Sequence, residues 1–225
     1  MPVARSALGV GRGSFSTVQP LFISFAGTEN PISQNNTFIH NNSTWKKPQV
    51  ISGVACNSVV QSNYDDAYAY VSPTYLFGNN YEVEATIFRT GGYAPVNGHE
   101  VEIILRMTEI GGTDVLAVEC LLGISSTGPY CQIMRWQGTE GPSYFTPIDD
   151  GSGSAIDPST GDKFRARVQG TTVTCGLVVG GSYTQMKIAT AGVTPTTGQP
   201  GMSFYTNTGG TLGNYGLSDY RVTPL

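Results

Sequence analysis

Few residues of this chain belong to the types that carry proton transfer or nucleophilic attack. Only two histidines, His40 and His99, occur in 225 residues, and histidine is the side chain that most readily exchanges protons near neutral pH. The serine-hydrolase elbow, the His-Glu-x-x-His zinc motif and the phosphate-binding glycine loops are all absent. Glutamate and aspartate can also transfer protons, so an enzyme remains an alternative. The composition nevertheless argues against one, and we assign no catalytic residue.

Patterns that would bind a metal ion are equally weak. The four cysteines contain no Cys-x-x-Cys pair and lie far from both histidines in sequence. Aspartates suited to calcium occur in loop-like segments, but none falls in the register of an EF-hand, so we interpret them as turn-forming or solvated. We therefore predict no metal and no cofactor. The aspartates are Asp65, Asp66, Asp149, Asp150, Asp157 and Asp162.

The cysteines are better explained as part of a core. Cys120, Cys131 and Cys175 lie in apolar runs, and Cys56 is isolated. A free cysteine behaves as a small buried hydrophobic residue. We predict free buried thiols, with a Cys120–Cys131 disulfide between neighbouring strands as the alternative.

Aromatic residues give the most plausible ligand site. Sugars stack on aromatic rings while polar side chains bond their hydroxyl groups, and Tyr130, Arg135, Trp136 and Tyr144 form a candidate platform of this kind. Core packing is the competing interpretation for Trp136, because tryptophan is usually largely buried. For Trp45 we favour core packing near the first strands.

Apolar and polar residues alternate with the period of β-strands. In residues 81–88, Tyr81, Val83, Ala85 and Ile87 point one way and Glu82, Glu84 and Thr86 the other. Glycine-rich turns separate the segments, and none shows a helical period with caps. We predict an all-β, two-sheet antiparallel jelly-roll sandwich. The expected strands are residues 18–25, 81–88, 100–107, 115–122, 130–136, 164–168 and 171–179.

The last third of the chain carries a family resemblance. A Gly-Asp-x-Phe-Arg hairpin covers residues 161–170, a Gly-x-Pro-Gly loop covers residues 198–201, and Asp219-Tyr220 stands in the final strand. This order resembles the C-terminal half of concanavalin A-like (laminin-G-like) jelly rolls, over residues 80–225. The resemblance implies the fold but leaves function open, since that fold serves lectins, glycanases, lyases and virion proteins.

The catalytic signatures that the resemblance would imply are missing. Family-16 glucanases use Glu-x-Asp-x-x-Glu on one strand, whereas Glu82-Val83-Glu84 is followed by Ile87 at the third position. Alginate-lyase-like relatives use a Gln-Ile-His strand, and here Met134 replaces the histidine. A solvated strand face explains the two glutamates better than a glycanase site.

Charge and hydropathy exclude further classes. The net charge is −4 and no basic cluster exists beyond Lys46-Lys47, so we expect no nucleic-acid partner. No run approaches the roughly 18 apolar residues of a membrane span. Residues 1–13 lack a continuous apolar run, so we predict no secretory signal peptide.

The N-terminal residues suggest assembly. Residues 1–7 contain too few apolar side chains to anchor themselves, and ordering each residue costs roughly 1–2 kcal/mol. We expect an arm that a neighbouring subunit holds, with an arm folded back on its own sandwich as the alternative. Residues 1–30 then form the arm and first strand, and residues 31–225 form the jelly-roll domain. The expected contact residues are Arg5, Leu8, Val10, Arg12 and Phe15.

These features lead to three functional hypotheses. The first is a non-enzymatic, oligomeric component of a virus particle, such as a phage capsid decoration or tail-associated protein, assembled in the host cytoplasm and able to bind surface glycans. The second is a carbohydrate-binding module outside a virion. The third is a glycan hydrolase or lyase.

Overall fold

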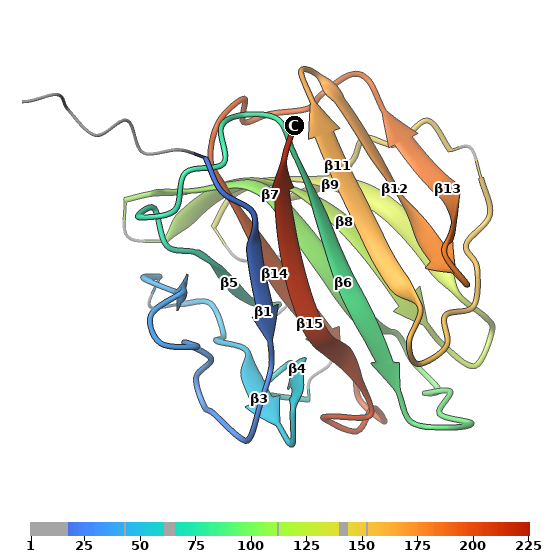
Figure 1. Cartoon of the computed structure of the whole chain (residues 1–225). Coiled ribbons are helices and arrows are strands. Elements are labelled where there is room, and N and C mark those ends of the chain that lie inside the picture. Colours follow the sequence, from blue (N-terminus) through green and yellow to red (C-terminus); the bar gives the residue numbers. More distant parts are fainter. Residues whose placement is uncertain (1–17, 43, 61–65, 112, 140–143, 152) are drawn as a thin grey trace, which may run out of the picture.

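The computed structural model describes residues 18–225 except 43, 61–65, 112, 140–143 and 152. Two antiparallel β-sheets pack face to face (Figure 1), and no helix occurs in the described residues. The prediction of an all-β jelly-roll sandwich is therefore confirmed. The described part also contains no helix that is long and apolar enough to cross a membrane.

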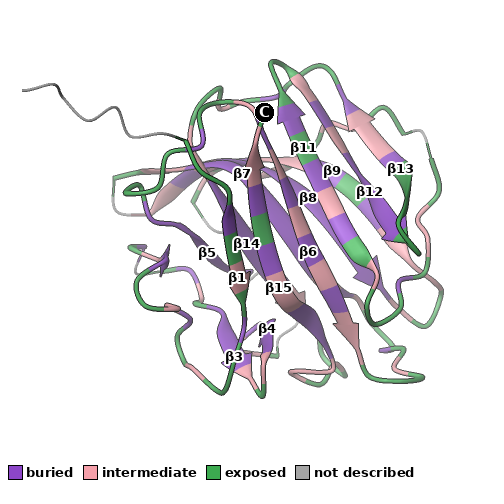
Figure 2. Ribbon diagram, in the orientation of Figure 1, coloured by how far each residue is buried: buried purple, intermediate pink, exposed green. Residues whose placement is uncertain are grey.

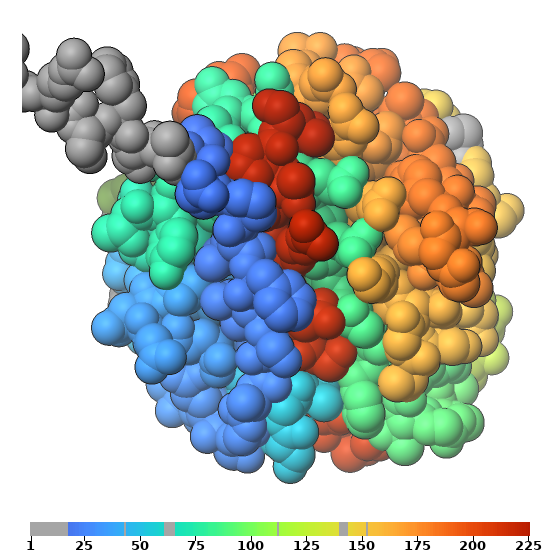
Figure 3. Space-filling model, viewed as in Figure 1, coloured from blue at the N-terminus to red at the C-terminus, as the bar shows by residue number. Residues whose placement is uncertain are grey.

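One sheet has eight strands. Strand β1 (Leu21–Ser24) pairs with β15 (Tyr215–Pro224) alongside the main path of this sheet, so the first and last strands of the described chain lie side by side (Figure 3). In order, the path runs through β13 (Ser182–Ala189), β12 (Thr172–Val179), β11 (Lys163–Gln169), β6 (Tyr81–Arg89), β15 (Tyr215–Pro224), β4 (Val54–Cys56) and β3 (Gln49–Ile51), with β1 (Leu21–Ser24) beside it.

The other sheet has seven strands and carries the candidate site. In order, it runs through β10 (Phe145–Pro147), β9 (Tyr130–Gly138), β8 (Asp114–Ile124), β7 (His99–Ile110), β14 (Gln199–Thr206), β5 (Ala67–Val71) and β2 (Phe38–Ile39).

The main core lies between the sheets, where alternate residues of each strand meet. On β6 the predicted alternation is confirmed, because Tyr81, Val83, Ala85 and Ile87 are fully buried (Figure 2). Across the outer face of the same sheet, Lys163 and Arg165 on β11 form ion pairs with Glu84 at 2.7 and 2.6 Å. Partial burial would raise the pKa of Glu84, but these two cations outweigh it and hold the pKa below its usual value.

Cys120, Cys131 and Cys175 belong to this core. All four cysteines are buried and free, as predicted, and the sulfurs of Cys131 and Cys175 lie 3.6 Å apart. These two residues come from different sheets. The alternative Cys120–Cys131 disulfide is not formed.

The positions expected to hold the arm to a neighbour lie outside the described residues. This applies to Arg5, Leu8, Val10, Arg12 and Phe15. The described chain enters the sandwich through β1, which forms part of the predicted strand at residues 18–25.

Candidate functional site

A hollow of about 410 Å³ opens on the outer face of the seven-stranded sheet, the face turned away from the main core. This volume is within the range of small-molecule sites. The lining combines three aromatic rings with carboxylates and amides. The rings are Tyr130, Phe145 and Tyr205, and the polar groups are Asp66, Glu100, Glu119, Gln132 and Asn207.

Strand register explains why these residues meet. Residues opposite each other in a β-ladder share one face of the sheet. One row across the outer face contains Tyr205 opposite Glu100 and Gly123 opposite Tyr130. The next row contains Ser203 opposite Glu102, followed by Leu121 and Gln132. Positions distant in sequence are thereby brought into two adjacent rows.

Two glycines make room for the ring of Tyr130. A methyl group added at Gly123 would lie 2.1 Å from the ring, and one added at Gly98 would lie 2.2 Å from the hydroxyl oxygen. The Tyr130 hydroxyl donates a 2.6 Å hydrogen bond to Oε1 of Glu100. The ring is therefore fixed over the sheet, with part of its surface left accessible to the hollow.

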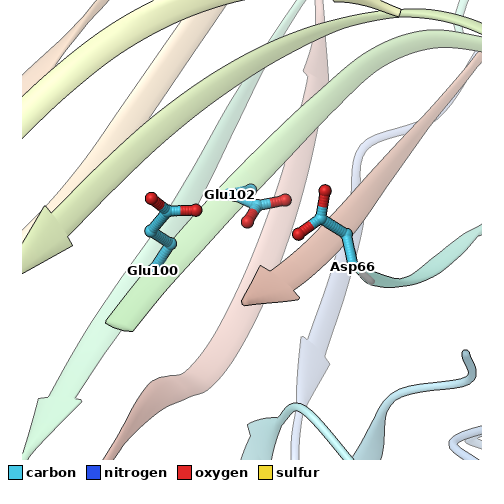
Figure 4. Close-up of side chains that lie close together, drawn as sticks. All are labelled: Asp66, Glu100 and Glu102. Atoms are coloured by element: carbon cyan, nitrogen blue, oxygen red, sulfur yellow. The ribbon is translucent and has the colours of Figure 1, made fainter. Parts of the chain in front are cut away.

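The floor of the hollow is acidic. One carboxylate oxygen from each of Asp66, Glu100 and Glu102 lies within 4.8 Å of the other two, and Figure 4 shows Glu102 between its two neighbours. Glu119 on β8 lines the same hollow, and no basic residue lines it within the described residues.

Burial and mutual repulsion change the acidity of these carboxyls. Burial raises the pKa of Glu100 to about 6. Burial and the charge of Glu100 raise the pKa of Glu119 to about 8. Glu102 is fully buried, and its pKa is raised well above the usual value by burial and by the charges of Asp66, Glu119 and Glu100. Part of the cluster therefore stays protonated near neutral pH.

A buried cluster around Trp45, Trp136 and Tyr144, called here the second aromatic cluster, adjoins the acidic floor and orients two of its carboxyl groups. The Trp136 indole donates a 2.6 Å hydrogen bond from Nε1 to Glu119, and the Tyr144 hydroxyl donates one of 3.1 Å to Asp66. Trp45 stacks on Trp136 with ring centroids 5.0 Å apart. The cluster also includes Tyr68, Tyr70, Ile104, Met107, Val115 and Ala117.

The predicted platform is not assembled as an exposed surface. Trp136 and Tyr144 are buried, with 0% and 2% of their surface exposed, because Trp45 and Phe145 pack against them. Arg135 alternates with Trp136 along β9 and so belongs to the opposite face of the strand. Of the four residues only Tyr130 lines the hollow. The interpretations of Trp136 and Trp45 as packed residues are confirmed, although both lie in the second aromatic cluster outside the two-sheet core.

Sequence reasoning missed Asp66, Glu100, Glu102 and Glu119 as one group. From sequence, Asp66 is interpreted as turn-forming or solvated, while Glu100, Glu102 and Glu119 fall within expected strands and receive no role. The other described aspartates fit the turn interpretation better. For example, Asp149 and Asp162 accept hydrogen bonds from nearby backbone amides, and Asp157 pairs with Arg89 at 2.6 Å.

Comparison with known proteins supports the fold rather than a named function. No family model matches the chain, and no curated protein matches its sequence. A legume lectin-like domain from Entamoeba histolytica superposes with a TM-score of 0.54 at 12% identity, covering 90% of this chain and 97% of that one. The Ca²⁺/mannose-bound exoplasmic/lumenal domain of VIP36 gives 0.59 at 12% identity, covering 92% and 89%.

The chain has the concanavalin A-like jelly-roll fold. The resemblance noted in the sequence is thereby confirmed at the level of fold. The same jelly roll also matches 41% of the longer xylan β-1,4-xylosidase of Bacillus halodurans C-125, with a TM-score of 0.53 at 12% identity over 97% of this chain. Lectins and a glycoside hydrolase thus share the architecture, and function must be argued from the hollow.

Proposed function

We propose that this jelly roll is a glycan-binding protein whose sugar site is the hollow on the outer face of the seven-stranded sheet. The observation that carries the proposal is the fixed ring of Tyr130 beside amide and carboxylate groups in a cavity of suitable size. An aromatic face supports the C–H surface of a sugar, while Gln132 and Asn207 offer hydrogen bonds to hydroxyl groups. VIP36 structures with mannose and Man3GlcNAc give an analogy on the same fold.

The charge of the hollow selects among glycans. Asp66, Glu100 and Glu119 line it together with no basic residue from the described part of the chain. A uronic or sialic acid would place another negative charge beside them, which is unfavourable in a partly buried site. We therefore expect neutral glycans.

The test is a glycan array followed by calorimetry on the best neutral glycan. Gln132 is exposed on β9 and lines the hollow, so Gln132→Ala removes a ligand contact with little effect on folding. Loss of one such hydrogen bond, about 1 to 1.5 kcal/mol, weakens binding roughly tenfold. Gln185→Ala is the matched control, because Gln185 is equally exposed but lies on β13 of the other sheet. The proposal is wrong if no neutral glycan binds, or if Gln132→Ala binds as tightly as the control.

A glycoside hydrolase is the second candidate, and the raised pKa values of Glu100 and Glu119 favour it. A carboxyl group that stays protonated near neutral pH can act as a general acid. However, Tyr130 donates a hydrogen bond to Glu100 and Trp136 donates one to Glu119, which is only 2% exposed, so both carboxyls are engaged with the protein rather than presented to a sugar. We therefore favour binding without catalysis. Release of new reducing ends from a bound glycan, abolished by Glu119→Gln, would instead establish the hydrolase.

The virion role remains a separate proposal. It depends on an N-terminal arm outside the described residues, so its support is the sequence argument alone. Deleting residues 1–13 should abolish incorporation into particles and leave the β fold intact. Full incorporation of the truncated chain would refute the arm hypothesis.

A further inference from the structure

A second hollow, of about 510 Å³, opens on the outer face of the eight-stranded sheet, on the opposite side of the sandwich from the proposed sugar site. This face is turned toward the viewer in Figure 3, where strands β11 to β13 are coloured in shades of orange. The volume is within the range of small-molecule sites. Two arginines, a glutamate, a tyrosine and several hydroxyl and amide side chains line this second hollow.

The second hollow has a preformed floor, because Arg165 contacts three side chains at once. Its Nε and Nη2 atoms donate hydrogen bonds of 3.0 and 2.6 Å to Glu84, and Glu82 lies 3.5 Å from Nε. Its guanidinium also lies over the ring of Tyr183, 5.2 Å from the ring centroid. The ring reaches Arg165 across β12, where Gly176 stands directly opposite Arg165 and has no side chain. A ring and a cation are thereby fixed before any ligand binds.

Arg167 supplies a cation that no carboxylate of the described chain engages. It is exposed on β11, and its Nη2 atom donates a 2.8 Å hydrogen bond to Oε1 of Gln169. Glu82 lies opposite Arg167 in the β11–β6 ladder but pairs with Arg165 instead, and Arg167 has no ion pair within the described residues. With Lys163, which pairs with Glu84, this part of the face holds three cations and two carboxylates.

The two hollows therefore differ in charge. Three carboxylates and no basic residue line the first, whereas two arginines and one glutamate line the second. An anionic group is repelled by the first and attracted by the second. A guanidinium group also matches a carboxylate in shape, since two parallel N–H groups can donate to its two oxygens.

The remaining lining suits a ligand rich in hydroxyl groups. Thr172, Thr174 and Gln185 offer hydroxyl and amide groups for hydrogen bonds, and Tyr183, which is 38% exposed, offers an aromatic face. An acidic peptide fits less well. The second hollow lies on the face of a sheet rather than at a strand edge, and its lining includes no aliphatic side chain that would form a side-chain pocket.

We propose that the second hollow binds acidic saccharides, with Arg167 as the anchor of a uronic or similar carboxylate and Tyr183 as the platform under the sugar ring. The chain would then carry two ligand sites of opposite charge on its two faces. The inference does not depend on glycan binding at the first hollow, because the two sites share no residue.

The experiment is a calorimetric titration of the full chain with trigalacturonate. Maltotriose, an uncharged sugar of the same length, and a peptide of three glutamates are the comparison ligands. Trigalacturonate should bind at one saturable site and at least tenfold more tightly than either comparison ligand, and its affinity should fall as sodium chloride rises from about 50 to 300 mM. Absence of binding up to about 10 mM trigalacturonate, tenfold above a millimolar dissociation constant, would overturn the proposal. Equal affinity for the peptide would also overturn it, since charge alone would then explain the binding.

Variants locate the ligand. Arg167→Gln should weaken trigalacturonate binding at least tenfold, whereas Arg221→Gln is the matched control, because Arg221 is an exposed arginine on β15 of the same sheet but does not line the second hollow. Tyr183→Ala should weaken binding through loss of the platform. Equal affinity of Arg167→Gln and the control would refute the site. Gln132→Ala, which alters the first hollow, should leave trigalacturonate binding unchanged, so this proposal and the neutral-glycan proposal fail separately.

Discussion

The hydrogen bond between Trp136 and Glu119 connects the buried aromatic cluster to the acidic floor, and a double-mutant cycle measures its contribution. Nε1 of Trp136 lies 2.6 Å from the Glu119 carboxylate, and both side chains are almost fully buried. The cycle uses Trp136→Phe, Glu119→Leu and the double variant. Each single change leaves one buried polar group without its partner, whereas the double change removes both.

The structure sets the size of the expected coupling. Leaving a buried donor or acceptor unsatisfied costs about 1–3 kcal/mol, whereas replacing both partners with apolar groups can be nearly neutral. Trp136→Phe also leaves a gap under Trp45, whose ring centroid lies 5.0 Å away, so we expect it to cost about 2–5 kcal/mol in total. Glu119→Leu should cost less, because it also removes a carboxyl group repelled by Glu100. The double variant should therefore be more stable than the sum of the single effects by about 1–3 kcal/mol.

Urea unfolding of the four proteins at neutral pH, followed by circular dichroism, gives the free energies. Effects that add within about 0.5 kcal/mol, as expected for independent sites, would show that the bond contributes nothing specific and would refute the reasoning.

Two further predictions concern buried groups outside the hollow. Burial lowers the pKa of His99 to about 4 from an ordinary 6.5. As the pH falls from about 6.5 to 4, the unfolded chain gains a proton on this residue and the folded chain does not, so the protein should lose about 1.4 kcal/mol of stability per pH unit. This part of the pH dependence of unfolding should be absent from His99→Gln. An unchanged pH profile in this variant would contradict the assignment. Tyr81→Phe removes the hydroxyl that accepts a 2.6 Å hydrogen bond from the buried backbone N–H of Arg106. We expect the free energy of unfolding in urea to fall by about 1–3 kcal/mol. A decrease below about 0.5 kcal/mol would contradict this prediction and would mean that water replaces the hydroxyl.

The two-sheet fold was accessible from sequence because its signal is local. Period-two alternation from Tyr81 to Ile87 marks a strand with one buried face, and glycine-rich turns mark its limits. Nothing in such a pattern specifies which strands become neighbours. The pairing of β1 with β15 joins opposite ends of the chain, and sequence proximity gives no indication of it.

The aromatic residues show where local reasoning fails. The sequence places Trp136 at the end of a strand, a position compatible with either a ligand or a core. The choice depends on Trp45, some ninety residues earlier, which stacks over its ring and buries it. A platform proposed from neighbouring residues therefore contained two side chains that packing had already covered.

The acidic floor could not be predicted from sequence for a related reason, because it depends on which residues lie opposite each other on neighbouring strands. Glu82-Val83-Glu84 and Glu100-Val101-Glu102 are the same pattern in sequence. The first pair faces Arg165 on the adjacent strand and is neutralised. Glu102 instead faces Ser203 on one side and Leu121 on the other. Neither neighbour can neutralise a carboxylate, so the charge is met by protons, in agreement with the raised pKa values of Glu102 and Glu119. Two identical sequence patterns therefore differ in their charge balance because different residues lie on the strands beside them. Replacing Leu121 with a basic residue should give Glu102 a cationic neighbour, as Arg165 already is for Glu82 and Glu84.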